Sequence, residues 1–211
     1  MYTQKRTLEQ WLALLGIVGA VFYFLHVIIG KANYPGYSSM AQAISDLTAA
    51  TAPSREIASA LTGIYGLFTV AACTILCIFY QRRTNKPFRA GIYLFAVMQW
   101  ISGVGYTLFP LSDSGYAGTF QDVMHVVVTA FVVLPAIASM VLITIGTIKT
   151  NAHRWLGILT MAALAAMAIG SIGMGAFPAE SFGIAERLNV YSVVLYTAVL
   201  SVFTFQYAEE I

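Results

Sequence analysis

Six uncharged apolar stretches, each long enough to cross a bilayer, constrain this chain more than any other feature. They are Trp11–Gly30, Ile57–Tyr80, Ala90–Phe109, Val123–Ile148, Trp155–Phe177 and Leu188–Tyr207. A helix needs about 20 apolar residues to span the hydrocarbon core of a membrane. Of the 211 residues, 59% are hydrophobic and 9% are charged, which excludes an ordinary soluble domain. The stretches lack β-barrel alternation, so helices are the only spanning structure left.

Part of the chain is repeated. Gly105–Ala130 aligns without a gap to Gly173–Ala198, including the pairs Phe109-Pro110 and Phe177-Pro178. A looser copy ends at Tyr34-Pro35, so Gly-x-x-x-(Phe/Tyr)-Pro closes each odd-numbered stretch, where proline stops the helix. We therefore predict an all-α, polytopic membrane protein: one transmembrane domain over residues 1–211, with six helices arranged as three helical hairpins and an uncleaved first helix.

The basic residues predict the orientation of the helices. Eight of the eleven lysines and arginines fall at one end of the predicted bundle: Lys5, Arg6, Arg82, Arg83, Lys86, Arg89, Lys149 and Arg154. By the positive-inside rule this end is cytoplasmic. We expect a protein of the inner or plasma membrane with both termini in the cytoplasm. A net charge of +2 does not indicate a nucleic-acid partner.

The first predicted outer loop is long. Within it, "SSMAQAISDL" has Ser39 as a potential N-cap, followed by Met40, Ile44 and Leu47 at helical spacing. This pattern predicts a short amphipathic helix at the membrane interface, lying over the outer mouth of the bundle as a lid.

Two histidines lie within predicted spans. His26 and His125 are expected at similar depth, just below the outer surface. An ionisable group in a span is a functional hypothesis by default, and these two are the candidate metal ligands, with zinc as the metal to consider. The alternative is that each imidazole bonds a neighbouring hydroxyl. Two histidines at one depth also allow axial haem ligation, the lowest-ranked reading.

Acidic residues near these histidines complete a set of candidate catalytic groups: His125, Asp122, Asp46 and Ser45. Asp122 precedes His125 by three residues, so it shares a helix face with the imidazole and can orient it. Alternatively, Thr119-x-x-Asp122 is a capping box that begins the fourth helix. Asp46 is either a second acid or a solvated loop residue.

Glu186 and Arg187 begin the sixth helix. The guanidinium can hold a carboxylate or phosphate head group, or Arg187 can pair structurally with Glu186, Asp46 or Asp122. Together with an aromatic rim, these residues form a candidate ligand-binding set: His26, Tyr37, Asp46, His125, Glu186 and Arg187.

Several of these motifs resemble those of one family of membrane proteins. Tyr34-Pro-Gly-Tyr37, Ile44-Ser-Asp-Leu47, Phe109-Pro110, Asp122-x-x-His125 and Gly183-x-x-Glu-Arg187 are similar to the pattern of domain of unknown function 998, found in six-helix bacterial and archaeal membrane proteins. The resemblance covers nearly the whole chain and implies an inner or plasma membrane protein whose activity is not established. A more distant likeness is to the superfamily of seven-helix hydrolases that includes alkaline ceramidases, whose zinc is held by three histidines. Here His153 is predicted at the opposite end from the other two, so that site does not carry over.

The function expected first is binding of a lipid-like or small amphiphilic molecule in an outward-facing pocket. An intramembrane metal-dependent hydrolase is the alternative, and a small transporter a further one. Membrane lipid is the expected partner, and a homo-oligomer is left open. The sequence does not decide between enzyme and binding protein.

Overall fold

The computed structural model describes residues 5–148 and 153–207, and all regular structure in these ranges is helical. In chain order the elements are α1 (Leu8–Ala13), α2 (Leu15–Ala32), η1 (Ser45–Thr48), α3 (Arg55–Tyr80), α4 (Lys86–Leu108), α5 (Phe120–Ile148), α6 (Arg154–Ala176), η3 (Ala179–Ser181) and α7 (Phe182–Gln206). Six helices in these ranges are long and apolar enough to cross a membrane, α1 and α2 together forming the first. The six predicted spans are confirmed, and Lys149 lies outside the described residues.

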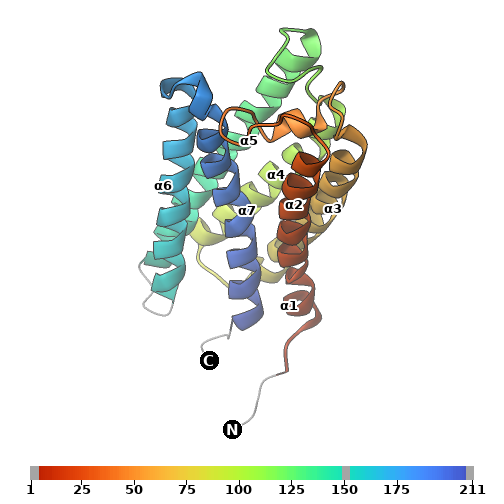
Figure 1. The fold of residues 1–211 in the computed structure, drawn as a ribbon. Coiled ribbons are helices and arrows are strands. Elements are labelled where there is room, and N and C mark those ends of the chain that lie inside the picture. Colours follow the sequence, from red (N-terminus) through yellow and green to blue (C-terminus); the bar gives the residue numbers. More distant parts are fainter. Residues whose placement is uncertain (1–4, 149–152, 208–211) are drawn as a thin grey trace.

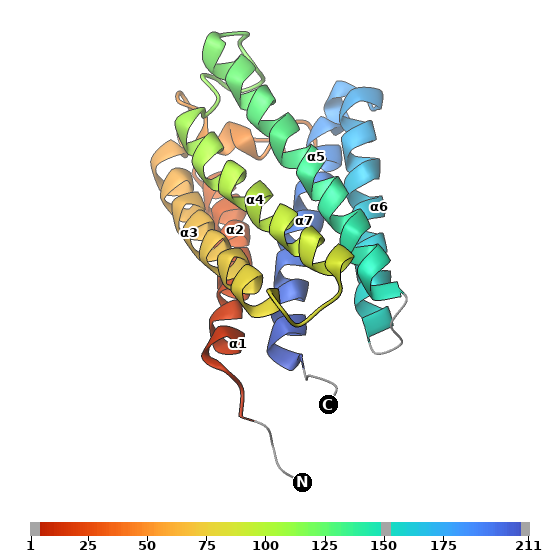
Figure 2. The ribbon, with the colours of Figure 1, turned by 180° about the vertical axis from the view of Figure 1, so that it is seen from behind.

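Each helix from α2 to α6 packs against the next one along the chain, and α7 packs against both α6 and α2. Figure 1 shows α7 between α2 and α6, and Figure 2 shows α4 and α5 crossing the opposite side of the bundle. Half of the α7 span is buried, against 22–39% of the other five. The last helix is therefore the central one, and the others surround it.

The two ends of the bundle differ. α1 begins and α7 ends at one end, which we call the terminus end; α3 is joined to α4 there, and α5 ends and α6 begins there (Figure 1). The loop end carries the first loop (residues 33–54), the second loop (residues 109–119) and η3. Three of the helices stop just before Pro35, Pro110 and Pro178, as predicted.

Local capping explains where several helices begin. Thr7 and Gln10 form a capping box at the start of α1, and the Asn85 side chain accepts the Phe88 backbone N–H at the start of α4. At α5, the Thr119 hydroxyl accepts the Asp122 N–H at 3.3 Å while the Asp122 carboxylate accepts the Thr119 N–H at 3.0 Å. These side chains satisfy N–H groups that have no partner within the helix itself.

The first loop differs from the prediction because no α-helix forms at "SSMAQAISDL". The segment is built of turns, followed by the single 3-10 turn η1. An α-helix would need the Gln42 and Ala43 carbonyls as acceptors, but these bond the side chains of Arg187 and Tyr37. The loop nevertheless covers the bundle, since the side chains of Ile44 and Leu47 are buried in the same apolar cluster as Tyr23 and Val27 of α2.

Candidate functional site

Four of the predicted ligand-binding residues, Tyr37, Asp46, Glu186 and Arg187, lie at the loop end, where the first loop meets α7 and the second loop. The Arg187 guanidinium donates to the carbonyls of Gln42 (2.9 Å) and Gly183 (2.8 Å) and to the Tyr37 hydroxyl (2.6 Å). The Tyr37 hydroxyl donates in turn to the Ala43 carbonyl at 2.6 Å. Arg187 therefore holds the first loop rather than pairing with an acid.

Burial raises the pKa of the Tyr37 phenol to about 12, although the neighbouring Arg187 guanidinium acts in the opposite direction. The phenol therefore stays protonated at neutral pH and remains able to donate to Ala43 while it accepts from Arg187. The guanidinium also lies 5.7 Å from the centre of the Tyr37 ring.

Glu186, the residue before Arg187 in α7, also holds the first loop. Its carboxylate accepts the backbone N–H of Ile44, and the Ile184 backbone N–H donates to the Met40 carbonyl at 3.2 Å. The Ile184 bond satisfies one of the first N–H groups of α7, which have no partner within the helix. Met40, Gln42 and Ile44 of the first loop are thus all bonded to the first turns of α7.

Asp46 joins the first loop to the second. Its side chain is 2% exposed, and it accepts the N–H groups of Ala43 at 3.2 Å and Gly115 at 3.1 Å. The second loop is joined again where the Ala50 N–H donates to the Leu111 carbonyl at 2.8 Å. Asp46 is therefore a structural acceptor and not a solvated loop residue. No hydrogen bond connects it to His26 or His125 in the described part of the chain.

Asp122 and His125 do not bond each other. Asp122 is fully buried, and it accepts from the Ser112 N–H at 2.7 Å and from the Thr119 hydroxyl at 3.0 Å, which confirms the capping reading. The His125 Nδ1 atom lies 2.8 Å from the Phe109 carbonyl oxygen, and the ring lies 4.8 Å from that of Tyr106. The Phe109 carbonyl, not Asp122, orients this imidazole.

His26 differs from every other predicted site residue. Its side chain is 2% exposed, and neither Nδ1 nor Nε2 has a hydrogen-bond partner. The nearest described ring is that of Tyr23, edge-on at 5.5 Å, which itself contacts Tyr65 at 4.8 Å and Tyr191 at 6.4 Å. His26 is therefore a buried, unpaired polar group beside Tyr23, which joins it to the aromatic side chains of α3 and α7.

Comparison of the chain with known proteins identifies its family. The family model described as "Protein of unknown function (DUF998)" matches residues 17–203, nearly the whole chain. The chain belongs to this family. No curated protein and no solved structure matches it. The family description names no activity, and the function proposed below for this DUF998 protein therefore rests on the arrangement of its own residues.

The motifs that resemble this family converge in space. The aromatic Tyr37, the Ser45-Asp46 pair in η1 and the Gly183 to Arg187 segment of α7 form the hydrogen-bonded layer described above, and we call this layer the loop-end cap. Asp122 and His125 fasten the adjoining second loop to α5. Ser45 takes part through its backbone carbonyl, which accepts the Thr48 hydroxyl at 3.0 Å.

A metal centre receives no support from this arrangement. Among the residues that the structure describes, no three His, Cys, Asp or Glu side chains lie close enough together to hold a metal ion. The nitrogens of His26 face no acid, and Nδ1 of His125 is occupied by Phe109. The donor set therefore does not fit the zinc considered from the sequence, which needs three protein ligands.

Sequence reasoning missed two features of the site. Gly183 allows the first loop to approach α7, because a Cβ atom at this position would lie 2.4 Å from the Gln42 carbonyl oxygen. The second is an aromatic group in which Tyr23 contacts His26 and packs against Tyr65 and Tyr191. The signal for Gly183 was its place in the Gly183-x-x-Glu-Arg187 motif; nothing in the sequence marked the tyrosines.

Proposed function

We propose that this DUF998 protein binds a small amphiphilic molecule in the loop-end half of the bundle, with the polar end of the molecule at His26. The observation that carries the proposal is the pair of buried ring nitrogens without a partner. Leaving a buried donor or acceptor unpaired costs about 1–3 kcal/mol. Unpaired polar groups are rare in folded proteins and need an explanation such as a bound molecule.

The chemistry of the site limits what this molecule can be. A neutral imidazole presents one donor and one acceptor. A hydroxyl or an amide group can satisfy either nitrogen, since each can donate and accept. The Tyr23 ring, which contacts His26, packs in turn against Phe24 and Tyr191, and these rings offer an apolar surface to the rest of the molecule. We therefore expect an uncharged head group that carries hydroxyl or amide groups.

Access from the loop end requires the loop-end cap to move. Loop 33–54 covers this half of the bundle, and its own side chains Ile44 and Leu47 are buried in the apolar cluster below it. The polar connections to be broken include the bonds of Arg187 to Tyr37 and Gln42 and of Glu186 to Ile44. With the orientation predicted by the positive-inside rule, this entrance faces outward.

The proposal is tested by thermal unfolding of the purified protein against a panel of amphiphiles that share one chain length. The panel contains head groups with hydroxyl or amide groups, and matched methyl ethers or esters that cannot donate. The wild type is compared with His26→Leu, which removes both ring nitrogens at similar volume. We expect hydroxyl or amide amphiphiles to raise the melting temperature of the wild type and to have no effect on His26→Leu.

The same variant separates binding from folding. Because His26→Leu removes an unpaired polar group, we expect its melting temperature without ligand to equal or exceed that of the wild type. His125→Leu, which loses the bond to Phe109, serves as the second histidine control and should lower stability without abolishing the ligand shift. Equal ligand shifts in the wild type and His26→Leu would contradict the proposal.

A further inference from the structure

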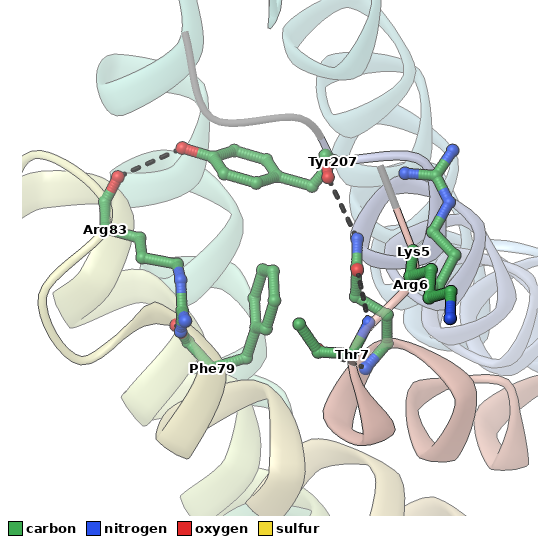
Figure 3. Close-up of a pocket in the computed structure, with 7 residues that line it drawn as sticks. Lys5, Arg6, Thr7, Phe79, Arg83 and Tyr207 are labelled. Carbon is green, nitrogen blue, oxygen red and sulfur yellow. Dashed lines mark hydrogen bonds between the residues drawn. The ribbon is translucent and has the colours of Figure 1, made fainter. Parts of the chain in front are cut away.

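A recess at the terminus end lies far along the bundle from His26. It has a volume of about 100 Å³ and opens between α1, the end of α3 and the end of α7. In Figure 3, Phe79 and Arg83 lie on one side of it, Tyr207 closes the top, and Thr7, Lys5 and Arg6 lie on the other side. The loop-end cap takes no part in it.

Hydrogen bonds join the helices that surround this recess. The Gln10 side chain, 5% exposed, donates to the carbonyls of Thr204 at 3.2 Å and Tyr207 at 2.9 Å, which joins α1 to the last turn of α7. The Tyr207 hydroxyl donates to the Arg83 carbonyl at 3.0 Å, which joins α7 to the end of α3. Arg83 itself is held, because its guanidinium donates to the Phe79 carbonyl at 2.6 Å.

The recess is positively charged. Lys5, Arg6 and Arg83 line it, while Glu9 is an acid close enough to Arg83 to interact with its charge. Within residues 5–148 and 153–207, the side chains of Lys5 and Arg6 make no hydrogen bond or ion pair, and the Arg6 guanidinium only faces the Phe205 ring at 5.4 Å. The two terminal cations therefore have donors available for an anion. A neighbouring hollow beside Arg83 adds Arg82.

We propose that this recess binds a phosphate group, and that the phosphate belongs to an anionic membrane lipid. A volume of about 100 Å³ is large enough for a phosphate group. Outside it, Leu8, Trp11 and Leu12 of α1 are 70%, 56% and 37% exposed, so an acyl chain can lie along that helix. Basic sites of this kind at the ends of membrane helices bind anionic head groups.

The binding test compares two double variants that each remove two positive charges. Lys5→Gln/Arg6→Gln changes the recess, whereas Lys31→Gln/Arg55→Gln changes two exposed cations at the loop end. Short-chain phosphatidylglycerol and phosphatidylcholine are titrated onto each protein in neutral detergent, and occupancy is measured by native mass spectrometry. We expect phosphatidylglycerol to bind the wild type more tightly and Lys5→Gln/Arg6→Gln about 30-fold less tightly than the wild type.

The control double should keep its affinity for phosphatidylglycerol within about twofold, as expected for charges remote from the site. Equal losses in both doubles, or an unchanged affinity in Lys5→Gln/Arg6→Gln, would overturn the proposal. In a second experiment, inorganic phosphate is added as a competitor of the bound phosphatidylglycerol. Failure of millimolar phosphate to displace the lipid supports the lipid assignment, whereas displacement would assign the site to a soluble phosphate compound. The outcome is independent of the His26 test.

Discussion

Gly183 is the residue on which the closed loop end depends most directly. A Cβ atom there would lie 2.4 Å from the Gln42 carbonyl oxygen and 2.8 Å from that of Ser39. Both contacts are with backbone, which cannot rotate away as a side chain can. The loop must therefore shift if any side chain is added, and the bonds of Arg187 to Gln42 and Tyr37 shift with it.

We expect Gly183→Ala to lower the free energy of unfolding by about 1–3 kcal/mol, the usual cost of overpacking. Gly63→Ala is the matched control, because nothing lies within 4 Å of a Cβ atom at that position on α3. In the control, alanine should be neutral or stabilising by up to about 1 kcal/mol. Chemical unfolding in detergent measures both. A Gly183→Ala variant as stable as Gly63→Ala would show that the loop does not press on α7.

At the scale of the helices, α7 is held in the centre of the bundle by polar contacts as well as by packing. The Gln99 amide of α4 donates to the Thr197 hydroxyl at 3.0 Å, and the hydroxyls of Tyr196 and Thr160 lie 2.8 Å apart between α7 and α6. Both pairs are buried. Hydrogen bonds between membrane helices contribute about 0.6 kcal/mol on average, so each is a modest addition to packing.

A double-mutant cycle on Gln99→Leu and Thr197→Val tests this at the α4–α7 contact. Each single change should destabilise: Thr197→Val removes the acceptor of the buried Gln99 amide, and Gln99→Leu removes a donor to the Thr197 hydroxyl, which keeps its bond to the Val193 carbonyl. The double change should cost less than the sum of the two, with a coupling of about 0.5–1.7 kcal/mol. Purely additive effects on the unfolding free energy would mean that the bond between the two side chains contributes nothing.

At the scale of the whole molecule, the basic residues still predict which end faces the cytoplasm. Arg82, Arg83, Lys86 and Arg89 cluster at the terminus end, whereas Asp113 and Glu180 belong to the loop end. The Thr51 hydroxyl and the Ser114 N–H donate to the exposed Asp113 carboxylate and lower its pKa. Asp113 therefore stays ionised at neutral pH and contributes negative charge to the surface of the loop end.

Cysteine labelling in intact cells tests the orientation. Ser181→Cys at the loop end should react with a membrane-impermeant maleimide, and Gln81→Cys at the terminus end should react only after permeabilisation. The native Cys73 is buried and Cys77 is partly buried, so an unmodified chain gives the background. The reverse pattern would place the loop-end cap in the cytoplasm.

Patterns local in the sequence predicted much of this protein. The six spans, their ends at Pro35, Pro110 and Pro178, and the Thr119–Asp122 cap each depend on residues a few positions apart. Helix length in a membrane and capping are decided by such neighbours, because the bilayer and the first helical turn impose them directly.

The partners of the polar side chains were decided only by the tertiary structure. Arg187 was expected to hold a head group or to pair with an acid, but it bonds the Gln42 carbonyl and the Tyr37 hydroxyl, 145 and 150 residues away. The helix expected over "SSMAQAISDL" is absent because α7 and Tyr37 take the carbonyls that it would need. The sequence marks His26 as one of several candidate site residues, and only the structure shows that its ring nitrogens are buried without a hydrogen-bond partner. Such contacts depend on where the chain returns after crossing the membrane several times, and no local pattern contains that information.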